Sequence, residues 1–111
     1  MKAYLTRSDV RQLRTMERKG EQLIRAGLPV TDVRNMLANL TAALGYYNVY
    51  RTSRDHREIT ANKAETLRRV GLARSDYKSL RNRISDAKLA KVLDGAYFGV
   101  LNKLKVRKDG L

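Results

Sequence analysis

Apolar residues recur along most of the chain at the three- and four-residue spacing of amphipathic helices. Between residues 8 and 26, one side of the predicted helix is apolar, with Val10, Leu13, Met16, Leu23 and Ile24. Four arginines gather within roughly 60° on another side of the same helix: Arg11, Arg14, Arg18 and Arg25. Gly27, followed by Leu28 and Pro29, is typical of a helix end, because glycine accepts a C-terminal cap conformation and proline cannot prolong a helix.

A second helix is predicted from Thr31 and Asp32, and its apolar residues continue at helical spacing to about Tyr47. Because it carries almost no charge, we expect it to be the central helix of the core. Residues 45–50 fit either a continued helix or a short extended piece, since aromatic and β-branched residues favour strands. Residues 51–58 contain no apolar side chain, and this indicates a loop or a solvated helix end.

Further helices are predicted in the C-terminal half of the chain. A shorter helix from Thr60 is expected to stop at Gly71 and Leu72, much as the first helix stops at Gly27. Another helix is expected to begin at Ser75. Ser85 and Asp86 then predict the cap of a last helix, whose apolar stripe closes the core.

The predicted fold class is therefore all-α. The chain of 111 residues has room for one compact domain, and the pattern indicates four or five helices in residues 1–111. There is no linker-like or low-complexity stretch that would mark a domain boundary. Residues 103–111 are rich in lysine and arginine and are predicted to form a basic C-terminal tail.

One ten-residue phrase occurs twice, at residues 5–14 and 72–81, with Leu, Arg, Ser, Asp, Leu and Arg in register. A looser copy begins at Leu28. In each copy a Ser or Thr followed by Asp supplies the oxygen and the negative charge that favour a helix start. Residues 21–40 also align with residues 65–84 at a constant offset of 44. The alignment is compatible with a duplicated hairpin of helix, Gly-Leu turn and helix, or with similar capping in two unrelated hairpins.

The excess of positive charge indicates the class of binding partner. The formal net charge is +13, from 24 Lys and Arg against 11 Asp and Glu, which favours a polyanion: nucleic acid, an anionic membrane surface or an acidic protein. Residues 51–91 carry a net charge of +7 and residues 1–30 a net charge of +4, whereas residues 31–50 are neutral. Fifteen of the cations are arginine, whose planar fork suits phosphate and guanine.

The segment from residue 63 to residue 83 resembles, in general form, the helix-turn-helix class of DNA-binding motifs. In this interpretation Gly71 lies in the turn, and the basic helix after it enters a major groove. Leu67 and Tyr77 depart from the motif, which usually has a small residue and an aliphatic residue at those places. An ordinary helical hairpin with a solvated basic face is the alternative.

The candidate nucleic-acid-binding residues form two groups. One group lies on the helix expected from Ser75: Arg74, Ser75, Lys78 and Arg81. The other group lies on the N-terminal helix: Arg7, Arg11, Arg14, Arg18 and Arg25. At this spacing each helix presents its cations on one face to phosphates or guanine edges, and a serine hydroxyl can donate to phosphate.

Other residues offer weaker signals. A cluster near the middle of the chain fits either a stacking platform for unpaired bases or the edge of the core: Tyr46, Tyr47, Tyr50, Arg51, Arg54 and Arg57. Gly95 and Gly99, four residues apart, indicate tight helix packing or a dimer seam. His56 has no suitable ligand set around it, so we predict no metal site.

Enzyme chemistry is not indicated. The sequence has no phosphate-cradling glycine loop with a lysine, no nucleophile beside a base and no carboxylate cluster for Mg²⁺. We therefore predict a protein without catalytic residues or a cofactor. The absence of cysteine excludes disulfides and thiolate sites, and no apolar run resembles a signal peptide or membrane span, so a cytoplasmic protein is expected.

Taken together, these features predict a small basic nucleic-acid-binding protein, with duplex DNA favoured over RNA, that binds mainly through electrostatic contacts. A homodimer would suit such a protein, since one short helix provides little specificity. The alternative is a small regulatory or inhibitory protein whose basic surface docks on an acidic host protein or on a ribonucleoprotein complex.

Overall fold

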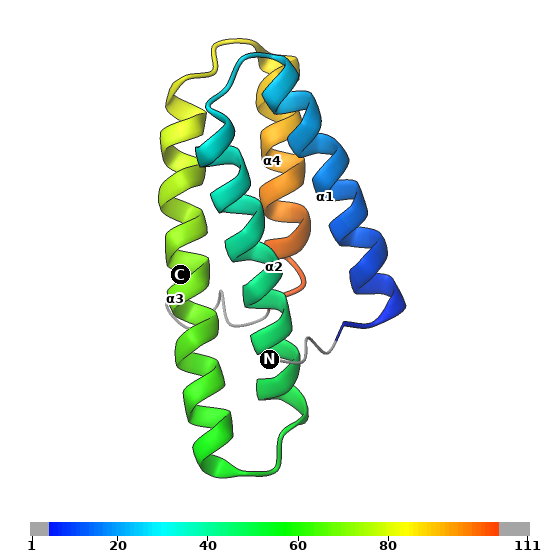
Figure 1. The fold of residues 1–111 in the computed structure, drawn as a ribbon, viewed down its shortest axis with the longest axis vertical. Helices are drawn as coiled ribbons and strands as arrows, with labels where there is room; N and C mark the ends of the chain where they lie inside the picture. The colour runs from blue at the N-terminus through cyan, green and yellow to red at the C-terminus, as the bar shows by residue number, and fades with distance from the viewer. Residues whose placement is uncertain (1–4, 105–111) are drawn as a thin grey trace.

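Four antiparallel helices make up the part of the chain that the computed structural model describes, residues 5–104. Their bounds are α1 Arg7–Arg25, α2 Val30–Thr52, α3 His56–Asn82 and α4 Ala87–Leu101. These residues contain no strand, and successive helices run in opposite directions (Figure 1). The α2–α3 hairpin extends beyond α1 and α4 at one end, because α2 and α3 are the longer helices. The predicted all-α domain of four or five helices is confirmed.

Local signals in the sequence determine both ends of α1. The Thr6 hydroxyl accepts from the Asp9 amide at 3.0 Å, and the Asp9 carboxylate accepts from the Thr6 amide at 3.1 Å, which is a capping box. At the other end Gly27 has φ 97°, and the amide of Leu28 donates to the carbonyl of Leu23. This is the Schellman arrangement that favours glycine. The predicted end of the helix at Gly27 is confirmed.

Helix α2 is the central element of the core. It begins at Val30, so Thr31 and Asp32 lie in its first turn, and no side chain caps it. It contacts each of the other three helices. Residues 45–50 are helical throughout, which answers the question that the sequence left open. Burial of the apolar face of α2 outweighs the strand preference of its aromatic and β-branched residues.

Helix α3 corrects the sequence interpretation. It continues for 27 residues through Gly71, so the predicted stop at Gly71 and the predicted new start at Ser75 are both wrong. Val70 and Ala73, on either side of the glycine, are fully buried. Their packing outweighs the cost of a mid-helix glycine, about 1 kcal/mol. Because there is no turn, the helix-turn-helix resemblance does not hold.

The duplicated-hairpin interpretation fails for the same reason. Gly27 ends a helix and is followed by a buried Leu28, whereas Gly71 lies within a helix and is followed by Leu72, which is 43% exposed. The 44-residue alignment therefore pairs a helix end with a helix middle. Ser75 and Asp76 do not cap α3. Burial raises the pKa of Asp76, and the negative charge of Asp32 on α2 raises it further.

Two matched glycine substitutions test this difference. Gly71→Ala is expected to stabilise the protein by about 1 kcal/mol, because Gly71 is helical and a methyl group there would meet nothing within 4 Å. Gly27→Ala also has open space, but its φ of 97° strains any L side chain, so a loss of about 1 kcal/mol is expected. Urea unfolding measures the change in the free energy of unfolding for both variants. A destabilising Gly71→Ala would contradict a continuous α3.

The core lies between the four helices, and α4 closes it with an apolar stripe as the sequence predicted. The large side chains that are almost completely buried are Met16, Leu23, Val33, Met36, Leu40, Leu44, Val70, Leu80, Leu93, Val100 and Leu104. Leu104 belongs to the predicted basic tail and packs in the core, while residues 105–111 of that tail lie outside the described residues. Within residues 5–104, no helix has both the length and the apolar character needed to cross a membrane.

Glycines let α1 approach its neighbours closely. Gly20 of α1 lies against the Leu37 side chain of α2. Gly95 and Gly99 of α4 lie under the side chains of Lys19 and Gln12, which come from α1. Of the two interpretations of Gly95 and Gly99, tight packing within the chain is therefore the observed one.

Candidate nucleic-acid interface

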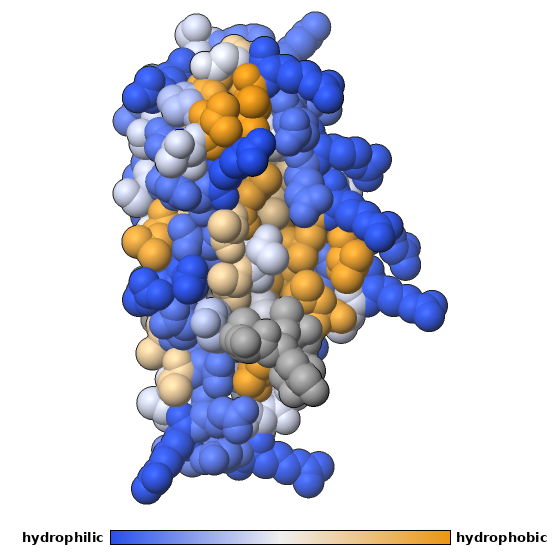
Figure 2. Space-filling model, in the orientation of Figure 1, coloured by the Kyte–Doolittle hydropathy of each residue, from blue (hydrophilic) through white to orange (hydrophobic). Residues whose placement is uncertain are grey.

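The outer face of α1 carries five exposed arginines, which we call the α1 arginine ridge: Arg7, Arg11, Arg14, Arg18 and Arg25. They lie on the side of the helix opposite its buried residues Leu13, Met16 and Leu23. At 1.5 Å per residue, the ridge extends for about 27 Å along the helix. In Figure 2, long hydrophilic side chains project from the edge of the molecule where Figure 1 shows α1.

The guanidinium groups of the ridge have no ion-pair partner among residues 5–104. The ion pairs in that part of the chain join Glu65 to Arg68 and Arg69, and Asp9 to Lys103. Glu17 and Glu21 are exposed on α1 but lie beyond ion-pair distance of the ridge. The ridge is therefore a solvated, mainly cationic face, with Glu21 between Arg18 and Arg25, that neither the core nor an internal salt bridge requires.

Shallow clefts follow the ridge and add neutral hydrogen-bond donors to its cations. One cleft of about 520 Å³ is lined by Ser8, Arg11, Gln12, Arg14, Thr15 and Arg18. A second cleft of about 350 Å³ is lined by Leu5, Thr6, Arg7, Val10, Arg11 and Arg14. Guanidinium groups beside hydroxyl and amide donors are the groups that proteins use to bind phosphate oxygens.

The second predicted group lies on α3, away from the ridge. Arg74, Ser75, Lys78 and Arg81 are all exposed, but they lie within a continuous helix and not on a recognition helix that follows a turn. Arg81 donates to the Ile84 carbonyl at 3.3 Å, near the start of the α3–α4 connection. Helices α1 and α3 lie at opposite edges of the bundle, with α2 and α4 between them (Figure 1). The structure therefore does not join the two predicted basic groups into one surface.

The central tyrosines lie at the edge of the core. Tyr47 is buried, whereas Tyr46 and Tyr50 are half-buried. The guanidinium of Arg51 lies over the Tyr47 ring at 5.9 Å, and that of Arg69 lies over the Tyr46 ring at 6.0 Å. These intramolecular contacts favour the core-edge interpretation over an open stacking platform. His56 is exposed at the start of α3, and in the described part of the chain no three His, Cys, Asp or Glu side chains could hold a metal ion.

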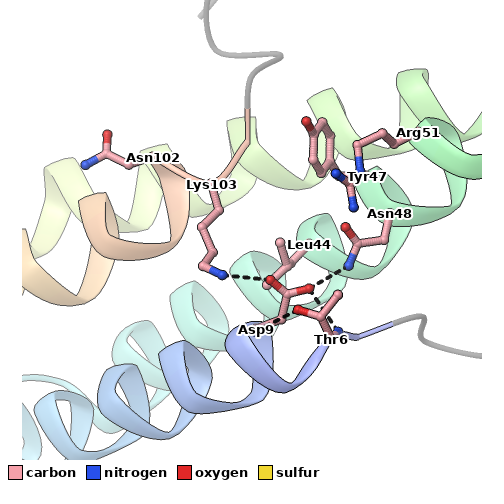
Figure 3. Close-up of a pocket in the computed structure, with 8 residues that line it drawn as sticks. All are labelled: Thr6, Asp9, Leu44, Tyr47, Asn48, Arg51, Asn102 and Lys103. Atoms are coloured by element: carbon pink, nitrogen blue, oxygen red, sulfur yellow. Dashed lines mark hydrogen bonds and ion pairs between the residues drawn. The ribbon is translucent and has the colours of Figure 1, made fainter.

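A buried polar network that the sequence interpretation missed ties together three helix ends (Figure 3). The Asp9 carboxylate accepts from Asn48 of α2 at 2.8 Å and from the Lys103 ammonium, just after α4, at 2.9 Å. Asp9 is only 6% exposed, and the adjoining hollow of about 300 Å³ includes Thr6, Tyr47 and Arg51 in its lining. The Thr-x-x-Asp spacing at residues 6–9 was the available signal, because it is a capping-box pattern.

The charge state of Asp9 follows from these contacts. Burial alone raises the pKa of a carboxyl group, but the hydrogen bonds from Lys103, Thr6 and Asn48 outweigh it and lower the pKa of Asp9 to about 2. Asp9 is therefore ionised at neutral pH. Since its oxygens are all engaged within the chain, the network stabilises the fold.

Comparisons of the chain with protein families, with curated proteins and with solved structures gave no match.

Proposed function

We propose that this is a cytoplasmic nucleic-acid-binding protein whose α1 arginine ridge contacts the backbone of duplex DNA. The observation that carries the proposal is the ridge itself: five exposed arginines on one helix face with no ion-pair partner among the described residues. Nothing in the packing of the bundle requires these side chains. A row of closely spaced like charges is unfavourable alone and becomes favourable against a polyanion, where it releases counterions.

The shape of α1 supports a duplex as the preferred nucleic acid. Helix α1 lies at an edge of the bundle, so its outer half is clear of the other helices (Figure 1). The major groove of B-DNA is about 12 Å wide and admits an α-helix. A rigid ridge of about 27 Å matches the length of about eight base pairs, at about 3.4 Å per pair. Arginine can bind either phosphate or guanine bidentately at such a surface.

A salt titration of binding tests the proposal. We expect the wild-type protein to bind a duplex of about 20 base pairs, with the logarithm of the affinity falling linearly with the logarithm of salt concentration. If all five ridge arginines contact phosphate, the slope should be about −4.5. Fluorescence anisotropy at several salt concentrations, with duplex DNA, single-stranded DNA and RNA, measures the affinity and hence the slope. Absence of binding to all three near physiological salt would overturn the proposal in favour of an acidic protein partner.

A further inference from the structure

An aromatic cluster joins α3 to α4. The rings of Tyr77 and Tyr97 are stacked, with centroids 4.3 Å apart and an angle of 16° between their planes. Phe98 meets both rings edge-on, at 5.5 Å from Tyr77 and 4.9 Å from Tyr97. Phe98 is therefore held by two neighbouring rings as well as by its own helix.

Unlike its neighbours, Phe98 is open to solvent. It is 40% exposed, whereas Tyr97 is 3% exposed and Tyr77 is half-buried. The Tyr77 hydroxyl donates to the Asp94 carboxylate at 2.6 Å, and burial together with this bond raises the pKa of Tyr77 to about 12. This hydrogen bond holds the Tyr77 ring in place. It also occupies the Asp94 carboxylate, which lies one helical turn before Phe98. The cluster thus presents one large aromatic side chain on a rigid base.

Cations from α3 and α4 flank the aromatic cluster. Arg74 lies close enough to Tyr97 to oppose the rise in the pKa of Tyr97 that burial causes, and Arg81 acts in the same sense on Tyr77. Lys91 lies two turns before Phe98 on the same face of α4, and it is exposed, as are Arg74 and Arg81. An open aromatic ring bordered by arginine and lysine is the arrangement that binds unpaired bases, because the base stacks on the ring while its phosphates meet the cations.

We infer that this surface, which we call the α3–α4 seam (Arg74, Tyr77, Arg81, Lys91 and Phe98), binds an unpaired nucleotide of single-stranded nucleic acid, with its base stacked on Phe98. The inference rests on the proposed nucleic-acid binding and adds a second site with a different ligand preference. Charge favours this occupant over an apolar peptide, since three exposed cations lie along the seam and the nearby acid Asp94 is engaged by Tyr77. A base inside a duplex cannot reach Phe98, because its faces are already stacked.

Substitutions at Phe98 separate stacking from packing and from charge. Phe98→Ala and Phe98→Leu are each expected to weaken binding of a single-stranded thymidine oligonucleotide about tenfold, while Phe98→Trp keeps the affinity. Leucine preserves apolar packing but has no π-face. Leu72→Ala is the matched control. It truncates a different exposed apolar side chain, which lies on α3, and should leave binding unchanged. Thermal melting of each variant confirms that it is folded.

The ligands supply the second control. An abasic strand of the same length and charge should bind the wild-type protein more weakly than the thymidine strand, and Phe98→Ala should not weaken it further. Duplex binding should be unaffected by Phe98→Ala. Equal affinity of Phe98→Leu and wild type for the thymidine strand would overturn the inference, as would equal affinity of the wild type for the two strands. If the wild type binds the thymidine strand through Phe98 but binds no duplex, the ridge proposal fails and the seam stands.

Discussion

Replacing Arg11, Arg14 and Arg18 together by alanine is expected to weaken duplex binding roughly a hundredfold at about 0.1 M salt. Each arginine that contacts a phosphate releases about 0.9 counterion, so losing three should reduce the steepness of the salt dependence by about 2.7. The fold should not suffer, because all three side chains are exposed and have no ion-pair partner among residues 5–104. Fluorescence anisotropy at several salt concentrations gives both quantities, and circular dichroism checks that α1 remains helical.

A second triple variant separates the ridge from net charge alone. Arg34, Arg54 and Lys88 are exposed and lie on different parts of the bundle, so replacing them by alanine removes the same charge without touching α1. We expect this control to lose only a fewfold in affinity, through weaker long-range attraction. Equal losses in the two triple variants would mean that binding depends on total charge, and the ridge would then have no specific role.

Replacing Asp9 by alanine is expected to cost about 3 kcal/mol of stability, the largest loss we predict for a polar residue in this chain. The change removes the capping box at the start of α1 and leaves the Lys103 ammonium and the Asn48 amide without their carboxylate. Denaturant unfolding measures the loss. Lys103→Met in the Asp9→Ala background should recover part of it, since an unpaired, partly buried ammonium is removed.

Asp86 provides the matched control for the cap. It is also an N-cap aspartate, and its carboxylate accepts from the Lys88 amide at 3.0 Å, but it is exposed. Asp86→Ala should therefore cost only about 1 kcal/mol, the usual value of a helix cap. If Asp9→Ala costs no more than Asp86→Ala, the contacts to Asn48 and Lys103 contribute nothing to stability.

The pH dependence of unfolding reports on the same carboxylate. The pKa of Asp9 falls from 3.8 to about 2 in the folded protein, so the folded state binds the proton less tightly than the unfolded state. The resulting stabilisation, about 2 kcal/mol, is fully present above pH 3.8 and is lost as the pH falls through the folded value of about 2. Asp9→Ala should flatten the stability profile in this window.

Short-range signals predicted much of the fold correctly. Apolar spacing identified the helical class and the central, sparsely charged α2, since helix faces follow directly from residue spacing. Gly27 identified the end of α1, because its left-handed backbone is a local requirement. The exposure of the α1 arginines was also predictable, since they lie opposite the apolar residues of the same helix.

Contacts between residues far apart in the sequence determine the features that local patterns did not predict. Gly71 resembles Gly27 in sequence, yet packing of Val70 and Ala73 keeps α3 continuous through it. The network of Asp9, Asn48 and Lys103 joins residues up to 94 positions apart, and no local pattern reports such a contact. No local pattern singled out Phe98, and only its contacts with Tyr77 and Tyr97 show an exposed ring on an aromatic base.

Spacing and composition alone thus predicted the all-α class, the sparsely charged central helix and the arginine face of α1, because each depends on residues within a few helical turns. Packing between helices decided where α3 ends, which polar groups are buried, and that α1 and α3, which carry the two basic groups, lie at opposite edges of the bundle. The physical reason is energetic. A local preference is worth about 1 kcal/mol per residue, and burial of one large apolar side chain is worth about 2 kcal/mol or more.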